Sequence, residues 1–239
     1  MPSAELDALL ALQEYDTTLD QVRNQRETLP ERTLIHELNL RRRASEAAAT
    51  ELAARSESLA TQEIDVESEL NVVEKRVATL DATLRAPGGA GTRDAQAIVH
   101  EVDHLRERAA QLEEQGLTLL QERDDVATEQ AEIAASLDGV ATQASAAFAA
   151  LAAAEASLDA QAAETTAARD AARAAVPVEL LATYDRLRER LGGVGAARVS
   201  GGSCSGCHLA LSSVDVDRLH KLAPGEFATC EQCGRILVP

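Results

Sequence analysis

Three features of the sequence predict a mainly α-helical protein, in which a long antiparallel helical hairpin precedes a small domain that holds all the cysteines. Apolar residues recur every 3.5 residues along two long stretches, glycine is absent from residues 1–85 but clusters in residues 88–91, and the four cysteines are confined to residues 204–233. A sustained 3.5-residue period is typical of left-handed coiled coils. Glycines between two such stretches indicate the turn of a hairpin.

The composition favours thin helices over a thick globular core. Of the 239 residues 2% are aromatic, and 40 Asp and Glu against 23 Lys and Arg give a formal net charge of -17. Alanine, which is abundant, buries little apolar area. Residues 195–239 hold four acids and four bases, so the other 36 acids and 19 bases lie in residues 1–194. Because this charge repels phosphate, a nucleic-acid contact would have to be local.

The first arm is predicted to reach Arg85, with a break near Leu29, because the ring of Pro30 excludes the carbonyl of the preceding turn. Alternating steps of four and three residues define its seam, the stripe that faces the other arm. The seam positions are Ala8, Leu12, Tyr15, Leu19, Val22, Leu52, Ser56, Leu59, Glu63, Val66, Leu70, Val73, Val77, Leu80 and Leu84.

The second arm is predicted to begin at Thr92, whose side chain can cap the helix, with Asp94 near its positive end. Of its eighteen seam positions from Ile98 to Leu158, fifteen are Ala or a larger aliphatic residue. Pairing Leu84 with Ile98 makes facing residue numbers add to about 182, which gives the two arms equal length. We therefore expect a hairpin over residues 1–176 with its tip at residues 86–92.

Some seam positions are polar, namely Arg42, Glu63, Arg123 and Gln130. Polar residues in a seam either fix the register within one chain or specify a partner chain. A homodimer, or a hairpin that serves only as a spacer, therefore remains an alternative.

A short helix is predicted over Val178–Leu191, because Pro177 suits a helix start and Gly192 and Gly193 suit a stop. Residues 177–194 then form a bracket between the hairpin and the cysteine domain, residues 195–239.

The cysteines form two Cys-x-x-Cys pairs, Cys204 with Cys207 and Cys230 with Cys233, separated by 22 residues. Two such turns supply the four tetrahedral thiolates of a closed Zn²⁺ site, and Gly234 permits the left-handed backbone of such a turn. The flanks predict short strands and one helical turn, which is the layout of a zinc ribbon. The strands are expected at 198–199, 209–211, 227–229 and 236–238, and the helical turn at 214–222.

One structural Zn²⁺ is the preferred interpretation of the four cysteines, with a redox dithiol and structural disulfides as alternatives. A redox pair would begin a helix after a strand and would not occur twice, and disulfides suit exported proteins. His208 could replace a ligand, but four thiolates already close the shell. A closed shell leaves no position for water, so we expect no metal-centred catalysis and name no catalytic residue.

The sequence resembles the bacterial C4-type zinc ribbon proteins with an N-terminal coiled-coil hairpin. The carriers are the segments 92–101, 184–188, 204–211 and 230–237, and the resemblance extends over essentially the whole chain. It implies zinc at the four cysteines. The family resembled includes, in flagellated bacteria, an accessory factor connected with an alternative sigma factor and with messenger RNA. Other members resemble adaptors for secretion machinery.

Two function hypotheses follow. The first is a non-catalytic adaptor that binds protein or nucleic acid (RNA or DNA) through the ribbon, while the hairpin presents a second surface. Its candidate contacts are the basic residues of the ribbon, which could equally be plain solvated surface because four acids balance them: Arg198, Arg218, Lys221 and Arg235. The second is a transcription-associated factor that inserts the hairpin tip, with Arg93 and Asp94, into RNA polymerase, although the tip lacks an acid cluster to hold a metal ion.

The sequence also predicts a cytoplasmic protein that makes no membrane contact. No stretch approaches 18 consecutive apolar residues, and the N-terminus lacks the basic and apolar blocks of a signal peptide.

Overall fold

The structure is a computed structural model that describes residues 4–86, 91–223 and 226–239, apart from the side chains of Thr92 and His220. The expected cap by Thr92 and the core of the expected tip, residues 87–90, therefore lie outside the described residues. The chain splits into two compact units, Met1–Leu34 with Ala147–Pro239 (unit 1) and Ile35–Ala146 (unit 2), and each is described by itself. The elements are α1 (Ala4–Glu27), α2 (Pro30–Arg85), α3 (Thr92–Ala174), α4 (Val178–Arg190), β1 (Ala196–Ser200), β2 (Ser203–Cys204), α5 (Ser213–His220), β3 (Ala228–Thr229) and β4 (Ile236–Val238).

The break in the first arm lies where proline predicts it. α1 ends at Glu27 and α2 begins at Pro30. The backbone N–H and the hydroxyl of Thr28 both donate to the carbonyl of Asn24, over 3.0 and 2.8 Å, which closes the last turn of α1. Proline suits the first position of α2 because its missing N–H would have had no helical partner there.

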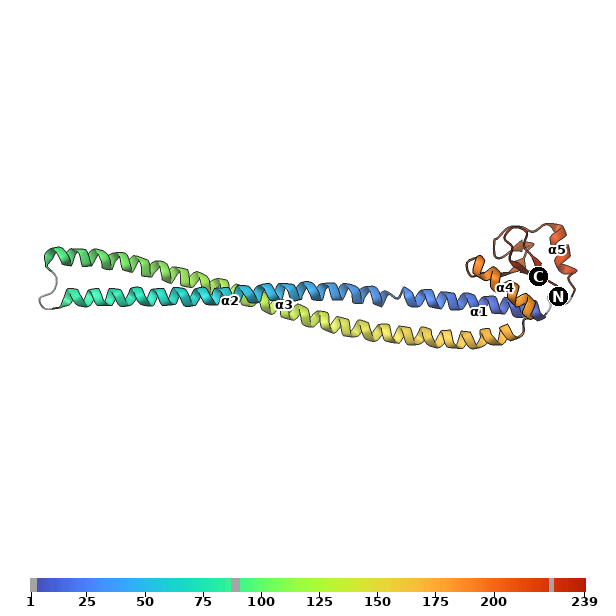
Figure 1. The fold of residues 1–239 in the computed structure, drawn as a ribbon, viewed down its shortest axis with the longest axis horizontal. Helices are drawn as coiled ribbons and strands as arrows, with labels where there is room; N and C mark the ends of the chain where they lie inside the picture. Colours follow the sequence, from blue (N-terminus) through green and yellow to red (C-terminus); the bar gives the residue numbers. More distant parts are fainter. Residues whose placement is uncertain (1–3, 87–90, 224–225) are drawn as a thin grey trace. The chain divides into compact units, whose positions relative to one another are not determined.

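In unit 2, α2 and α3 form an antiparallel coiled coil, visible as the two long helices of Figure 1. A buried cluster joins every other seam position from both helices: Leu59, Val66, Val73, Leu112, Leu119 and Val126. A Cβ placed on Gly116 would lie 3.9 Å from Cγ1 of Val66, so these two residues face each other and their numbers add to 182. The register predicted from the sequence is confirmed at this pair.

Ion pairs between α2 and α3 flank the seam and are consistent with the same register. Arg123 Nη1 donates to Glu63 Oε2 over 2.7 Å, so two of the polar seam residues pair within one chain. Arg42, expected in the seam, is instead exposed and pairs with Glu46 of its own helix at 2.6 Å. Exposed ion pairs contribute about 0–1 kcal/mol each. They therefore specify register more than they stabilise the coil.

The core of unit 1 is built from α1, α4 and two strands of the ribbon. One apolar cluster contains Leu9 and Leu12 from α1, Tyr184 from α4, and Ile236 and Val238 from β4, all with 0% exposure. Leu6 and Val176, which the register predicts to face each other, belong to the same cluster. α4 contributes residues 180, 184 and 187, the single face expected of a helix that covers a core.

The ribbon carries a four-stranded sheet of order β2-β1-β4-β3, in which β1 and β4 are parallel and the other neighbours are antiparallel. Three of the expected strands are present, but residues 209–211 make only one bridge, between Ala210 and Ser203. The expected strand there was wrong, because the backbone of this segment serves the first cysteine turn instead. α5 begins at an N-cap, where Ser212 Oγ accepts from the backbone N–H of Asp215 over 3.1 Å.

Among the described residues, α3 is apolar enough by length and composition to cross a membrane, with an 18-residue window of mean hydropathy 1.2 that is 11% buried. A single helix of this kind is weak evidence, because helices of non-membrane proteins meet the same criterion. α3 is rich in alanine, a residue that suits both a helix and a closely packed seam.

Candidate metal centre and partner surfaces

The two cysteine turns have the same backbone geometry. The N–H of His208 donates to the carbonyl of Cys204 over 2.7 Å, and the N–H of Gly234 donates to that of Cys230 over 2.7 Å. The residue after each pair takes a left-handed backbone, with φ of 62° at His208 and 76° at Gly234. Glycine adopts this conformation freely, whereas histidine is strained in it. His208 is exposed and lies outside the thiol cluster, so its role is in the turn.

The four sulfurs meet at one point. Their Sγ atoms all lie within 4.8 Å of one another, with Cys204 to Cys233 and Cys207 to Cys230 both at 3.9 Å. Zn–S bonds of about 2.3 Å in a tetrahedron place sulfurs about 3.8 Å apart. The donor set therefore fits one structural zinc ion. Cys204 and Cys230 are buried and the other two are half-buried.

Hydrogen bonds to the sulfurs of Cys204 and Cys233 favour the thiolate form, against the effect of burial. Burial raises the pKa of Cys204 to about 12, although the N–H groups of Gly206 and Cys207 donate to its sulfur and oppose the shift. Burial also acts on Cys233, but the N–H and the guanidinium of Arg235 lower its pKa to about 7. Donors aimed at sulfur favour the thiolate that binds metal, which agrees with a zinc site.

Arg235 belongs to this metal centre. Its Nε donates to the carbonyl of Val194 over 3.0 Å, and the side chain crosses Gly206 so closely that a Cβ there would lie 2.5 Å from Cδ of Arg235. The guanidinium also hydrogen-bonds to Cys233. The structure thus separates Arg235 from the basic residues with which the sequence grouped it.

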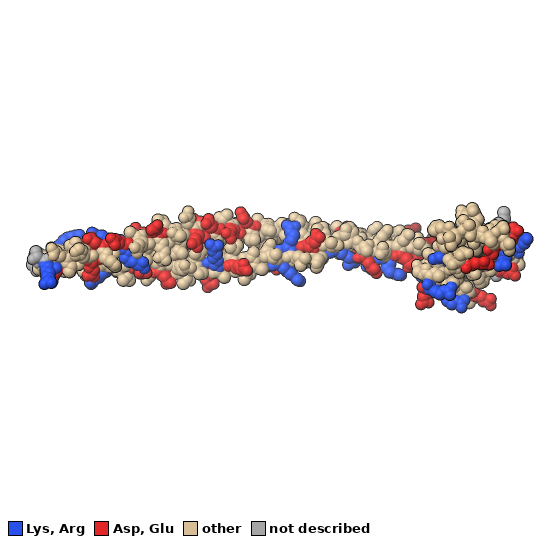
Figure 2. Space-filling model, turned by 90° about the horizontal axis from the view of Figure 1, so that it is seen from above, with Lys and Arg blue, Asp and Glu red and all other residues tan. Residues whose placement is uncertain are grey.

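Arg218 and Lys221 lie together. They line a hollow of ≈ 410 Å³ along α5, with Val214, Asp217, Leu222 and Glu226. Arg198 is exposed on β1 and does not line this hollow. Figure 2 shows acids and bases interspersed on the visible face. The tip residues Arg93 and Asp94 are exposed, and Asp94 is the one carboxylate among the described residues 82–86 and 91–94.

A buried polar cluster, which sequence reasoning missed, joins α1 to α4 within unit 1. Asp16 is 2% exposed. Its carboxylate accepts from Tyr184 Oη over 2.6 Å and from Arg169 Nε over 2.5 Å, and Arg188 Nε lies 3.3 Å away without the alignment of a hydrogen bond. Burial, then the bond to Asp16, raises the pKa of Tyr184 above its ordinary value.

Gln13, one turn earlier, ties α1 to the start of the ribbon. Its Nε2 donates to the carbonyl of Gly193 over 2.9 Å, and its Oε1 accepts from the N–H groups of Gly195 and Ala196 over 2.6 and 3.2 Å. The spacing of the sequence could have revealed this cluster, because Gln13 and Asp16 each lie four residues after a buried leucine and therefore on the same helix face as that leucine. Polar side chains on an apolar helix face need buried partners.

Comparison with known proteins decides the family. A family model described as the CT398-like coiled coil hairpin domain matches residues 12–192. The chain belongs to this family. A second model, described as a C4-type zinc ribbon domain, matches residues 203–237, so the CT398-like hairpin is followed here by a zinc ribbon. The resemblance and the fold class predicted from the sequence are confirmed.

Relatives of this CT398-like protein align along almost their whole length. Uncharacterized protein Rv2229c of Mycobacterium tuberculosis is 28% identical over 235 residues, which cover 98% of this chain and 95% of the relative. A solved structure from Mycobacterium smegmatis is 27% identical, with a TM-score of 0.82 and full coverage of both chains. CT398 from Chlamydia trachomatis is 18% identical, with a TM-score of 0.71 and coverage of 98% and 96%, and shares the fold.

Proposed function

We propose that this protein is a non-catalytic, zinc-binding adaptor of the cytoplasm, which binds a protein partner through its ribbon and a second one through its hairpin. The chain is built from a coiled coil and a zinc ribbon. A zinc ion held by four thiolates has no open position for water or substrate, so its contribution is structural. A reducing compartment suits thiols that must stay free to bind metal.

The hollow along α5 is the observation that carries the ribbon half of the proposal. It combines an apolar side chain, Val214, which is 65% exposed, with two bases and two acids. Apolar surface rimmed by polar groups is typical of protein contacts. The hollow's position beside the metal centre also makes it dependent on zinc, since Leu219 of α5 packs in one cluster with Cys204 and Cys230.

The mixed charge of the hollow favours a protein over RNA or DNA. Asp217 and Glu226 line it together with Arg218 and Lys221. Both carboxylates would repel a phosphate backbone, which is bound best by clustered bases. A folded protein can instead present charges of both signs in matching positions.

A purification from host extract tests this proposal. The tagged protein would be recovered with and without nuclease, alongside Arg218→Glu plus Lys221→Glu. The matched control is Arg41→Glu plus Arg43→Glu, which changes the charge equally at exposed positions of α2. We expect a stoichiometric, nuclease-resistant protein that binds the wild type and the control but is lost from the ribbon variant, whereas the partner of the hairpin is retained by the ribbon variant. Equal recovery with all three would refute the ribbon contact, and nuclease-sensitive recovery would assign the hollow to nucleic acid.

A further inference from the structure

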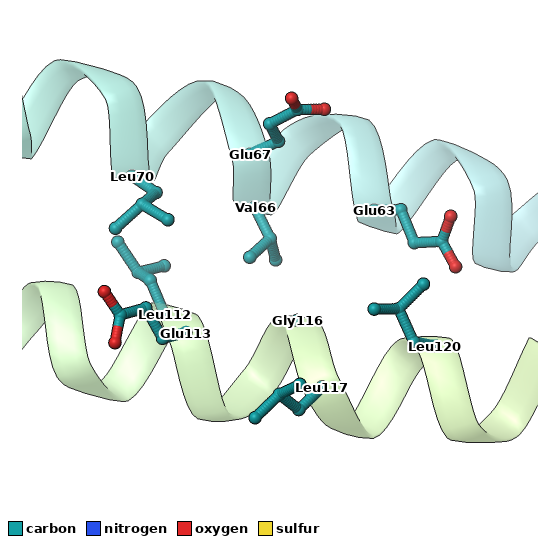
Figure 3. A pocket seen from close by; sticks show the side chains of 9 residues that line it. All are labelled: Glu63, Val66, Glu67, Leu70, Leu112, Glu113, Gly116, Leu117 and Leu120. Carbon is teal, nitrogen blue, oxygen red and sulfur yellow. The ribbon is translucent and has the colours of Figure 1, made fainter.

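A groove opens in unit 2 where the seam contains glycine. Gly116 of α3 faces Val66 of α2, and its missing side chain leaves a groove of ≈ 500 Å³ between the two helices (Figure 3). Leu70 and Leu112 close the apolar floor on one side, and Leu120 lies on the other. Leu117 and Leu120 are 69% and 43% exposed. Both leucines line the groove, so it offers apolar surface that a partner can reach.

The rim of this groove is acidic on both helices. Glu63 and Glu67 come from α2 and Glu113 comes from α3. Glu63 Oε2 is paired with Arg123, but Glu63 Oε1 is buried without a hydrogen-bond partner among the described residues. Within that same part of the chain, neither Glu67 nor Glu113 forms an ion pair. Arg123 offsets the charge of Glu63, whereas Glu67 and Glu113 offer negative charge that no ion pair among the described residues offsets.

We propose that this groove binds a basic amphipathic helix of a partner protein. An apolar side chain of that helix occupies the space above Gly116, its neighbours one turn away cover Leu117 and Leu120, and flanking Lys or Arg side chains pair with the acidic rim. A helix laid along the groove would use the anchors i, i+3, i+4 and i+7 of helix-in-groove recognition. This inference rests on the proposed adaptor function and specifies the partner of the hairpin.

Charge argues against a second copy of this chain as the occupant. Residues 1–194 carry 36 acids and 19 bases, so a second hairpin would bring further carboxylates to an acidic rim. Like charges across an interface cost binding energy. A neighbouring groove in unit 2 serves as a control site, because Glu129 and Glu132 line it together with a base, Arg55, that the proposed groove does not have.

The test uses the purified full-length protein and two synthetic helical peptides. One carries a single stripe of leucines flanked by lysines, and the other has glutamate in place of every lysine. Fluorescence anisotropy measures binding to the wild type, to Gly116→Leu, which fills the groove, and to Leu117→Gln, which removes apolar surface without changing the charge. Glu67→Gln plus Glu113→Gln removes rim charge, and Glu129→Gln plus Glu132→Gln is its control at the neighbouring groove.

We expect the lysine peptide to bind the wild type. Gly116→Leu and Leu117→Gln should each weaken this binding about tenfold or more, equivalent to about 1.4 kcal/mol. The rim variant should weaken binding several-fold more than its control. Folding should survive, because leucine is a better helix former than glycine, a Cβ at Gly116 lies 3.9 Å from Val66, and the rest of the side chain can extend into the groove of ≈ 500 Å³. Melting temperatures of each variant check this.

Equal binding of both peptides, or undiminished binding to Gly116→Leu, would overturn the proposal. A dimer in sedimentation equilibrium that Leu117→Gln abolishes would also overturn it, by assigning the groove to a second copy. Failure here is separable from failure of the adaptor function, because the ribbon variants and the host extract play no part in the peptide assay.

Discussion

Replacement of Asp16 by alanine should destabilise unit 1 more than any surface change. Asp16 is buried, and its carboxylate holds the hydroxyl of Tyr184 and the guanidinium of Arg169 while Arg188 lies at ion-pair distance. Removing one partner of a buried ion pair costs about 3–5 kcal/mol, and leaving a buried hydroxyl unpaired costs about 1–3 kcal/mol. The two costs overlap, because the same cavity admits water to both.

The two costs add to about 4–8 kcal/mol, and we expect a loss of stability near the lower end, about 4 kcal/mol. The reason is that the side chains of Arg169 and Arg188 are 25% and 27% exposed and can turn toward water when Asp16 is removed. For 150–250 residues, about 2–4 °C are lost per kcal/mol, so the melting transition should fall by about 8–16 °C. Differential scanning calorimetry measures the shift, and amide hydrogen exchange over residues 178–190 locates it in α4.

Asp20→Ala is the matched control. Asp20 lies one turn after Asp16 and pairs with Arg188 at 2.5 Å, but its side chain is 37% exposed. Its loss should cost about 1 kcal/mol or less, because solvent screens the pair. If Asp16→Ala and Asp20→Ala melted within a degree or two of each other, the argument from buried charge would be refuted.

Three further predictions concern the tyrosine, the cysteine turns and the metal. Since Tyr184 has a raised pKa in the folded state, its stabilising effect is complete below pH 10 and is lost as pH rises above 10. Above pH 10 the free energy of unfolding of the wild type, measured by urea denaturation, should fall by up to about 1.4 kcal/mol per pH unit more than that of Tyr184→Phe. Equal pH dependence of the two proteins would contradict this. His208→Gly should stabilise the ribbon by about 1 kcal/mol and Gly234→Ala destabilise it by about 1–2 kcal/mol, because both positions are left-handed. Competition with a zinc chelator measures the zinc affinity of both variants. Equal affinity of His208→Gly and Gly234→Ala would contradict the argument that side chains strain the left-handed backbone at these positions. A thiol-modifying mercurial should release one zinc per chain and abolish exchange protection in residues 203–223 and 226–229, because zinc binding and folding are coupled locally. Helical ellipticity should change little, and unchanged exchange protection would show that zinc is not structural.

Much of the fold follows from local or periodic patterns in the sequence. The 3.5-residue repeat predicts the seam and its register, and the pair Val66 and Gly116 confirms the register. Pro30 predicts the break, and the two cysteine turns predict the metal centre. Each of these depends on residues close in sequence or on a regular spacing, so no knowledge of distant contacts is needed.

The partner-binding surfaces and the buried polar cluster depend on contacts between residues far apart in sequence. Arg235 and Arg218 are both ribbon arginines, but only the fold turns Arg235 onto Val194 and Gly206 and leaves Arg218 beside Lys221 in a hollow. Likewise, Arg42 occupies a predicted seam position and still lies outside the seam. Whether a charged side chain is buried or exposed depends on which distant segments fold against it.

The sequence by itself determined the helical hairpin, its register, its break and the four thiols of the zinc ribbon, because periodicity and short spacings act locally along the chain. Only the tertiary structure decided that Gln13 and Asp16 join α1 to segments about 180 and 168 residues away, and that a missing side chain at Gly116 opens an acidic groove. The physical reason is that a buried hydrogen bond or an open groove is a property of surfaces brought together by folding, which no local pattern specifies.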